Sequence, residues 1–181
     1  MKKLQLCCLM MAVMAVAFAL PVQAVIYYGN YTTTVGTNVF SGKASISDNG
    51  KMWGEAGRSQ MIMRSDKKIA WTLMLPEKTY SEKPLSTQNS ALISKKVLGE
   101  LGRKKVGNEK LNTIECEKYQ VTCKVGKKNV SVYQWTSADY PFPLKAATID
   151  GKWSMELSQL QVSPQTDSVF ELPAGFTKTT M

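Results

Sequence analysis

Alternation of apolar and polar side chains in residues 69–75 constrains the fold more than any other feature of the sequence. Every second residue in this stretch is large and apolar, namely Ile69, Trp71, Leu73 and Leu75. Successive side chains of a β-strand point to opposite faces, so this period of two predicts a half-buried strand. Turn-forming residues flank it at 65–67 and 76–78. Residues 58–82 are therefore expected to form three antiparallel strands joined by two tight turns.

Strand signals continue on both sides of this segment. Residues 26–35 and 40–47 are rich in aromatic and β-branched side chains, and the Asn-Gly pair at 49–50 predicts a hairpin turn into 52–56. These runs and residues 58–82 predict a meander of about six strands. A second meander is expected from 113–124, 130–136, 143–145 and 152–162, with a bulge near Gln159 where the apolar parity shifts. We therefore expect one mainly β domain over residues 25–181.

Residues 86–101 form the one segment with a clear helical pattern. Ser86 or Thr87 can cap it, and Ile93, Val97 and Leu101 recur at i, i+4 and i+8. Basic residues surround its expected C-terminal end, where a helix dipole favours cations: Lys95, Lys96, Arg103, Lys104 and Lys105. Two interpretations are open: a solvated helix packed across the sheet, or a movable lid whose basic rim meets an anionic group.

The first 24 residues have the pattern of a secretory signal peptide. Two lysines precede an apolar run, and small residues before position 25 suit cleavage after Ala24. A retained membrane anchor is the alternative, but the run is short for a span of about 20 residues. We predict export to the periplasm without a transmembrane segment after cleavage, with secretion beyond the outer membrane as an open alternative.

The chain is basic, which bears on its partners. Loss of Lys2 and Lys3 with the leader lowers the formal charge from +9 to +7. An exported basic protein meets few nucleic acids, so anionic lipid headgroups, lipopolysaccharide or an acidic envelope protein are the expected counterparts. The alternative is that distributed lysines only keep a sheet-rich protein in solution.

The sequence offers little catalytic chemistry. It contains no histidine, which excludes Ser-His-Asp and Cys-His nucleophile activation and histidine-containing zinc sites. The 14 carboxylates are scattered, so a paired-carboxylate hydrolase is only a minor alternative. We predict no catalytic residue, no metal, no cofactor and no enzymatic activity.

Cys116 and Cys123 remain after removal of the leader. On one strand they would lie about 20 Å apart at ~3.3 Å per residue, whereas a disulfide needs Cα atoms ~4.4–6.8 Å apart. We predict two unpaired, largely buried thiols.

Large aromatic and methionine side chains suggest a cavity. A strongly curved sheet would gather them on its concave side as a flexible, polarisable lining, whereas a flat sandwich would bury them as ordinary core. The candidate lining residues are Met61, Met63, Trp71, Leu73, Tyr80 and Trp135.

Several short motifs resemble known exported proteins. The segment Ser-Asp-Lys-Lys-x-x-Trp at 65–71, followed by Pro76 and Tyr80, resembles the corresponding segment of the LolA/LolB-like lipoprotein-localisation superfamily. Motifs at 107–109, 114–119, 143–145 and 170–176 complete a resemblance to an uncharacterised bacterial family of exported single-domain proteins. The resemblance covers most of residues 51–176.

This resemblance implies a curved antiparallel sheet, an open half-barrel with one or two helices over its concave face. It also implies binding of a lipid or lipoprotein acyl group, or alternatively envelope interaction or stress sensing by a protein with a packed core. Two departures count against lipoprotein transport. Only one lid helix is evident, and neither Arg58 nor Arg64 matches the spacing of the arginine that helps to hold the lid in the carriers.

Overall fold

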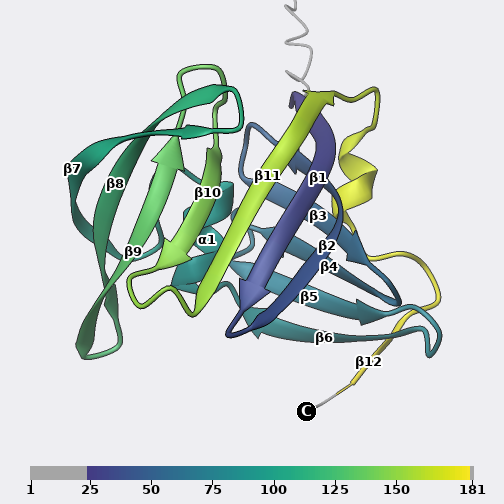
Figure 1. Ribbon diagram of the computed structural model, residues 1–181. Coiled ribbons are helices and arrows are strands. Elements are labelled where there is room, and N and C mark those ends of the chain that lie inside the picture. Colours follow the sequence, from purple (N-terminus) through teal and green to yellow (C-terminus); the bar gives the residue numbers. More distant parts are fainter. Residues whose placement is uncertain (1–23, 180–181) are drawn as a thin grey trace, which may run out of the picture.

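The computed structural model describes residues 24–179, which form one curved, open sheet with a helix on its concave face (Figure 1). Within this range twelve strands run in the order β12-β6-β5-β4-β3-β2-β1-β11-β10-β9-β8-β7. Their bounds are Ile26–Val35 (β1), Asn38–Ser47 (β2), Lys51–Ala56 (β3), Ser59–Arg64 (β4), Ile69–Met74 (β5), Thr79–Pro84 (β6), Glu100–Leu111 (β7), Ile114–Val125 (β8), Lys128–Thr136 (β9), Pro143–Thr148 (β10), Trp153–Val162 (β11) and Thr177–Lys178 (β12). Helix α1 spans Thr87–Ile93, and the 3-10 helix η1 spans Asp167–Phe170. The expected mainly β half-barrel is confirmed.

The three strands predicted in residues 58–82 are present as β4, β5 and β6, with antiparallel neighbours. Alternation in β5 buries Trp71 and Leu73 while Thr72 and Met74 stay exposed. Strands β1 to β3 complete the predicted six-stranded meander. The signal peptide predicted at 1–24 lies outside the described residues except for Ala24.

The second meander joins the first through the pairing of β1 with β11. Gln159 has a φ of +53°, and the register shifts between Tyr28 and Asn30, which pair with Gln161 and Ser158. The predicted bulge near Gln159 is therefore confirmed. Cys116 and Cys123 both lie on β8 as free, buried thiols, as predicted.

The predicted helix over 86–101 is wrong in its second half. Helix α1 ends at Ile93, and residues 100–111 form the edge strand β7 instead. Leu101, the expected last member of the apolar stripe, is 61% exposed on this strand. Ile93 and Val97 are buried, so the first part of the stripe packs as expected.

Tertiary contacts explain why the helix stops at Ile93. The buried Gln134 Nε2 of β9 donates to the carbonyls of Ala91 (2.7 Å) and Ser94 (2.9 Å), which a continuing helix would use itself. Gly99 then begins the turn into β7 with a φ of +73°. A Cβ at Gly99 would lie 2.5 Å from the Lys124 carbonyl oxygen, so only glycine fits this approach to β8.

In the described residues the buried apolar side chains form two clusters. On the concave face, Ala91, Leu92 and Ile93 of α1 pack into a large cluster that includes Met52 and Met63. On the opposite face, a smaller cluster centres on Trp71 and contains Ile26, Ile62, Leu73 and Phe170. Phe170 belongs to the C-terminal segment, residues 163–179, which crosses this face and ends in the parallel pairing of β12 with β6.

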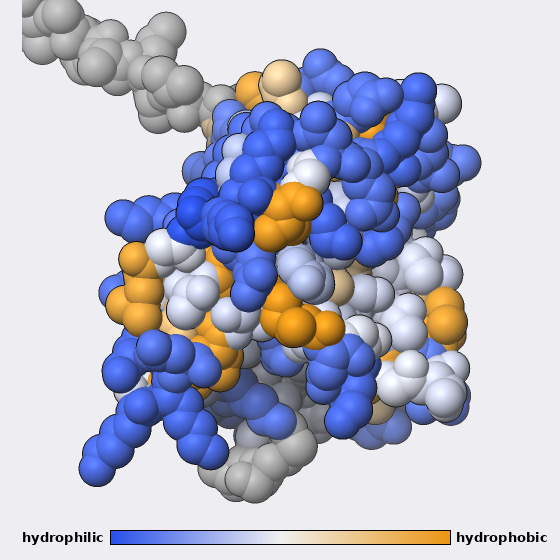
Figure 2. Space-filling model, turned by 60° about the vertical axis from the view of Figure 1, so that its left-hand side comes forward, coloured by the Kyte–Doolittle hydropathy of each residue, from blue (hydrophilic) through white to orange (hydrophobic). Residues whose placement is uncertain are grey.

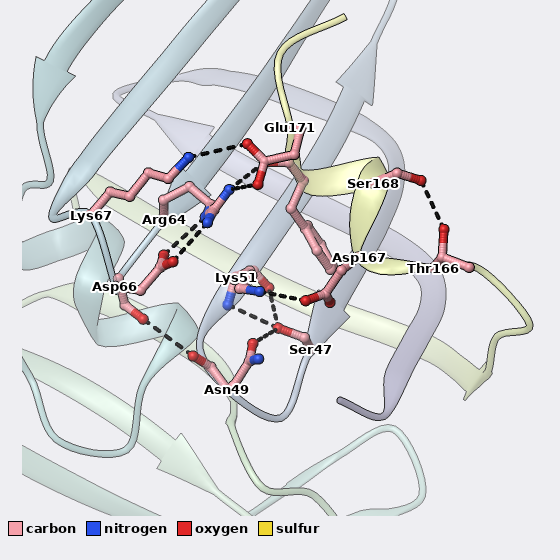
Figure 3. A network of polar contacts seen from close by, with 12 residues as sticks. Ser47, Asn49, Lys51, Arg64, Asp66, Lys67, Thr166, Asp167, Ser168 and Glu171 are labelled. Atoms are coloured by element: carbon pink, nitrogen blue, oxygen red, sulfur yellow. Dashed lines mark hydrogen bonds and ion pairs between the residues drawn. The ribbon is translucent and has the colours of Figure 1, made fainter. Parts of the chain in front are cut away.

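Ion pairs fasten the C-terminal segment to the sheet (Figure 3). The buried Arg64 guanidinium donates to both oxygens of Asp66 (2.9 and 2.7 Å), to the Phe170 carbonyl (3.2 Å) and to Glu171. Lys51 forms a second pair with Asp167 at 2.6 Å. The hydrogen bond from Arg64 lowers the pKa of Asp66 to about 2. Arg64 thus holds the C-terminal segment on the face opposite to α1, and it does not hold the helix.

Candidate ligand-binding groove

An apolar groove opens where the start of α1 meets the β8–β9 and β10–β11 turns. Its volume is about 710 Å³, within the ~300–1,000 Å³ typical of small-molecule sites. Four of its apolar side chains are exposed: Leu98, Val125, Val130 and Ile149. The other lining residues are Leu85, Ser86, Thr87, Gln88, Lys124, Ser131, Val132, Thr148 and Asp150. The groove therefore has an apolar wall in contact with solvent.

Local structure places each wall of the groove. The β8–β9 hairpin turns at Gly126, whose φ is +58°, and presents Val125 and Val130 on either side of the turn. Leu98 is held by its N–H, which donates to the Ser90 Oγ at 2.7 Å. Pairing of Val132 with Thr148 brings the β10–β11 turn, and with it Ile149, beside the hairpin. These turns thus position the apolar side chains.

Seven of the thirteen lining residues carry polar side chains, and two of these, Lys124 and Asp150, are charged. The Thr148 hydroxyl donates to Asp150 Oδ1 at 2.7 Å, and this hydrogen bond lowers the pKa of Asp150. The Lys152 N–H donates to the same oxygen at 3.1 Å, so this carboxylate is occupied by its own turn. Lys124 supplies the cationic group among the lining residues. This arrangement suits an apolar ligand with, at most, an anionic end.

Across the described fold the apolar surface is patchy. Figure 2 shows apolar groups interrupting a largely hydrophilic surface on the side of the molecule that carries β7 and β8. Single exposed apolar residues are normal on protein surfaces, whereas grouped ones rimmed by polar residues indicate a binding site. The groove meets that second description because its exposed apolar residues share one hollow.

The structure does not bring together the six residues predicted to line a cavity. Met63 is fully buried in the large cluster that includes the α1 side chains, and Met61 packs against the same cluster. Trp71 and Leu73 are buried on the opposite face, where Tyr80 packs against their cluster. None of these side chains lines the groove.

The sixth predicted residue, Trp135, lies on the face away from α1. Its neighbour Gln134 points to the helix, and alternation along β9 turns Trp135 the other way. The indole N–H donates to Glu109 Oε2 at 2.8 Å, and the Lys118 ammonium lies 4.6 Å from the ring centroid. Trp135 is only 4% exposed, and the Tyr133 ring packs edge-on against it at a centroid distance of 6.0 Å.

The predicted basic rim lies beside other hollows. Lys95, Lys96 and Arg103 line a separate depression of about 410 Å³ that shares no residue with the groove. Arg103 donates to both oxygens of Glu100 (2.8 and 2.7 Å), which raises the pKa of Arg103. Lys105 pairs with Glu117 at 2.5 Å. Two of the five predicted rim residues are thus engaged in ion pairs within the sheet.

The two cysteines of the described residues are buried and poorly suited to act as nucleophiles. Burial raises the pKa of the Cys116 and Cys123 thiols, which is the opposite of what a nucleophilic thiolate requires. Within residues 24–179, no three histidine, cysteine or carboxylate side chains gather as a metal site. No helix of the same residues is long and apolar enough to cross a membrane.

The fold and groove define a half-barrel with one helix over its concave face and an apolar hollow at one end. The chain belongs to the family described as a domain of unknown function, DUF4412, whose model matches residues 37–141. This confirms that the chain is a member of an uncharacterised family. No curated protein sequence matches the chain.

Solved structures with a similar fold are distant in sequence. PNGF-II matches with a TM-score of 0.47 and 10% identity over 86% of this chain, which spans only 31% of that protein. A DUF1329 family protein from Desulfovibrio piger matches with a TM-score of 0.43 and 16% identity, covering 83% of this chain and 91% of that one. A LolA superfamily protein from Nitrosomonas europaea matches with a TM-score of 0.40 and 10% identity, covering 84% and 91%.

Sequence reasoning did not identify the groove residues. Val125, Val130 and Ile149 adjoin turns, and only Val130 falls within a predicted strand, as the first residue of 130–136. The available signal was an apolar residue beside each of two glycine-containing turns, next to lysines at 124, 127, 128 and 152. Their convergence depends on pairing between β9 and β10, which residue patterns do not reveal.

Proposed function

We propose that the protein is a non-enzymatic binding module for an apolar ligand, the acyl chain of a lipid or lipoprotein, held in the groove. The observation that carries this proposal is the set of four exposed apolar side chains around a hollow of about 710 Å³. A folded protein gains nothing from leaving such side chains in water. An apolar guest would remove them from it.

The size of the effect suits a modest affinity. Each methylene transferred from water contributes roughly 0.8 kcal/mol, so ten would contribute about 8 kcal/mol. That figure corresponds to a dissociation constant of about 1 μM before the cost of ordering the ligand is subtracted. Lys124 at the groove would favour a ligand with an anionic headgroup. Affinity in the micromolar range or weaker, with little polar selectivity, is expected.

The site of action that we propose is the bacterial envelope. This rests on the signal-peptide pattern of residues 1–24. An exported binding module would meet lipids and lipoproteins there.

Displacement of a fluorescent apolar probe tests the proposal. Ile149→Asp places a charge in the groove wall, and we expect probe and fatty-acid affinity to fall at least about tenfold. Val162→Asp is the matched control because Val162 is 68% exposed at the far end of β11 and lies outside the groove. Native mass spectrometry of protein purified from its own envelope should also detect a bound lipid. Equal probe binding by both variants, or a protein that binds no probe, would contradict the proposal.

A second candidate function follows from the filled concave face. Ala91, Leu92 and Ile93 are at most 1% exposed between α1 and the sheet, so this region is packed as an ordinary core. A protein of this kind could act as an envelope interaction or stress-sensing module with no ligand. Crosslinking in cells that recovers one protein partner and no lipid would favour this alternative.

A further inference from the structure

Three hairpin tips lie together at one end of the sheet. The β1–β2 tip (residues 35–40) meets the β10–β11 tip (148–152), because the Gly36 N–H donates to the Lys152 carbonyl at 2.7 Å and Val35 pairs with Trp153. The β8–β9 tip (124–130) adjoins the β10–β11 tip across the groove that both line. In Figure 1 these connections appear at the lower end of β8 to β11 and β1. We call residues 35–40, 124–130 and 148–152 the tip surface.

The tip surface is unusually apolar for an exposed edge. Val39 is 63% exposed, Val35 50% and Phe40 49%. Val125, Ile149 and Val130 follow with 46%, 44% and 36%. Turns normally carry small polar residues, so six large apolar side chains on three adjoining tips call for a partner that covers them.

The charge of the tip surface identifies the kind of partner. Four lysines accompany the apolar residues: Lys124, Lys127, Lys128 and Lys152. The same residues contain one carboxylate, Asp150, which lies 3.7 Å from the Lys152 ammonium and accepts hydrogen bonds from its own turn. An apolar cluster ringed by cations complements an interface that is anionic outside and apolar beneath, and an anionic lipid bilayer has that profile.

We propose that the tip surface docks the protein on an anionic bilayer. The tips of β1–β2, β8–β9 and β10–β11 enter the headgroup region, and their lysines contact lipid phosphates. The groove shares Val125, Val130 and Ile149 with this surface, so docking would face its mouth toward the bilayer. That last consequence rests on the proposed function, whereas docking itself does not.

Vesicle co-sedimentation tests docking. The sample is the chain from Val25 onward, which holds all of the described fold except Ala24 and lacks the apolar leader that would itself bind lipid. We expect binding to phosphatidylcholine vesicles that contain phosphatidylglycerol, with loss at high salt because salt screens exposed charges. Binding to pure phosphatidylcholine vesicles should be at least about tenfold weaker, since each lysine near an anionic surface is worth about fivefold.

Paired variants separate the two contributions. Val39→Asp with Phe40→Asp removes apolar contact outside the groove lining, and Lys127→Glu with Lys128→Glu reverses charge. Each pair should lower the partition coefficient at least about tenfold. The controls Val162→Asp and Lys110→Glu, at the opposite end of their strands, should bind as wild type. A circular dichroism spectrum equal to wild type establishes that each variant folds.

The outcomes distinguish docking from ligand binding. If the wild-type chain does not bind anionic vesicles, or if the control variants lose binding as much as the tip variants, docking is overturned. The Val39 and Phe40 variant should still bind the apolar probe. If the wild-type chain binds anionic vesicles but no apolar probe, ligand binding in the groove is refuted and docking still holds.

Discussion

Replacement of the buried Gln134 by leucine should destabilise the fold strongly. The side chain is fully buried, and its Nε2 donates to the Ala91 and Ser94 carbonyls at 2.7 and 2.9 Å. Leucine fills similar space but leaves both carbonyls without this donor. An unsatisfied buried polar group costs about 1–3 kcal/mol, so we expect unfolding free energy to fall by about 2–5 kcal/mol. In a domain of this size that lowers Tm by roughly 5–15 °C.

Urea and thermal unfolding, followed by circular dichroism, measure this loss. Gln120→Leu is the matched control, because Gln120 pairs with Tyr133 on the neighbouring strand and faces away from α1. A half-buried surface substitution of this kind is expected to stay within about 0.5 kcal/mol of wild type. If Gln134→Leu loses less than about 1 kcal/mol, or no more than the control does, the capping role assigned to Gln134 is wrong.

Three further perturbations test other parts of the structure. The pKa of Asp66 is lowered to about 2 by the hydrogen bond from Arg64, so its stabilising contribution is present above pH 4 and lost as pH falls toward 2. Because this carboxylate is 44% exposed, the effect is small. We expect the difference in unfolding free energy between wild type and Asp66→Asn to shrink by no more than about 1 kcal/mol over that range, as measured by acid unfolding. Gly99→Ala should lower the unfolding free energy by more than the ~1 kcal/mol of a left-handed residue, because its Cβ would clash with the Lys124 carbonyl. Denaturant titration measures this loss. An unchanged stability would contradict the close approach of Gly99 to β8. Phe170→Ala empties a fully buried site and should cost about 3–5 kcal/mol, with faster proteolysis of the C-terminal segment; unchanged proteolysis would show that Phe170 does not anchor it.

Local patterns were sufficient to predict most strands, because period-two alternation and turn residues act within a few positions. They were insufficient where distant groups decide the outcome. The stripe of Ile93, Val97 and Leu101 is a valid helical pattern, yet Gln134, 40 residues away from Ser94, binds the carbonyls that would have continued the helix. No local signal in residues 94–99 shows that partner. The boundary of α1 is thus set by tertiary contact.

Pairing between distant residues also explains why the predicted cavity lining combined side chains that lie on opposite faces of the sheet. We placed Met61 and Met63 with Trp71 and Leu73, all at odd positions in adjacent strands. In the β4–β5 hairpin, however, Met63 pairs with Ala70 and Ile62 with Trp71, so each pair joins an odd position with an even one. Directly paired residues share a face, and odd positions of β4 therefore lie opposite odd positions of β5. The loop between the strands fixes that register. If the pairing of β4 with β5 were shifted by one residue, all four side chains would lie on one side of the sheet. Hence turn length, as much as side-chain type, determines which apolar residues of a meander can share a cavity.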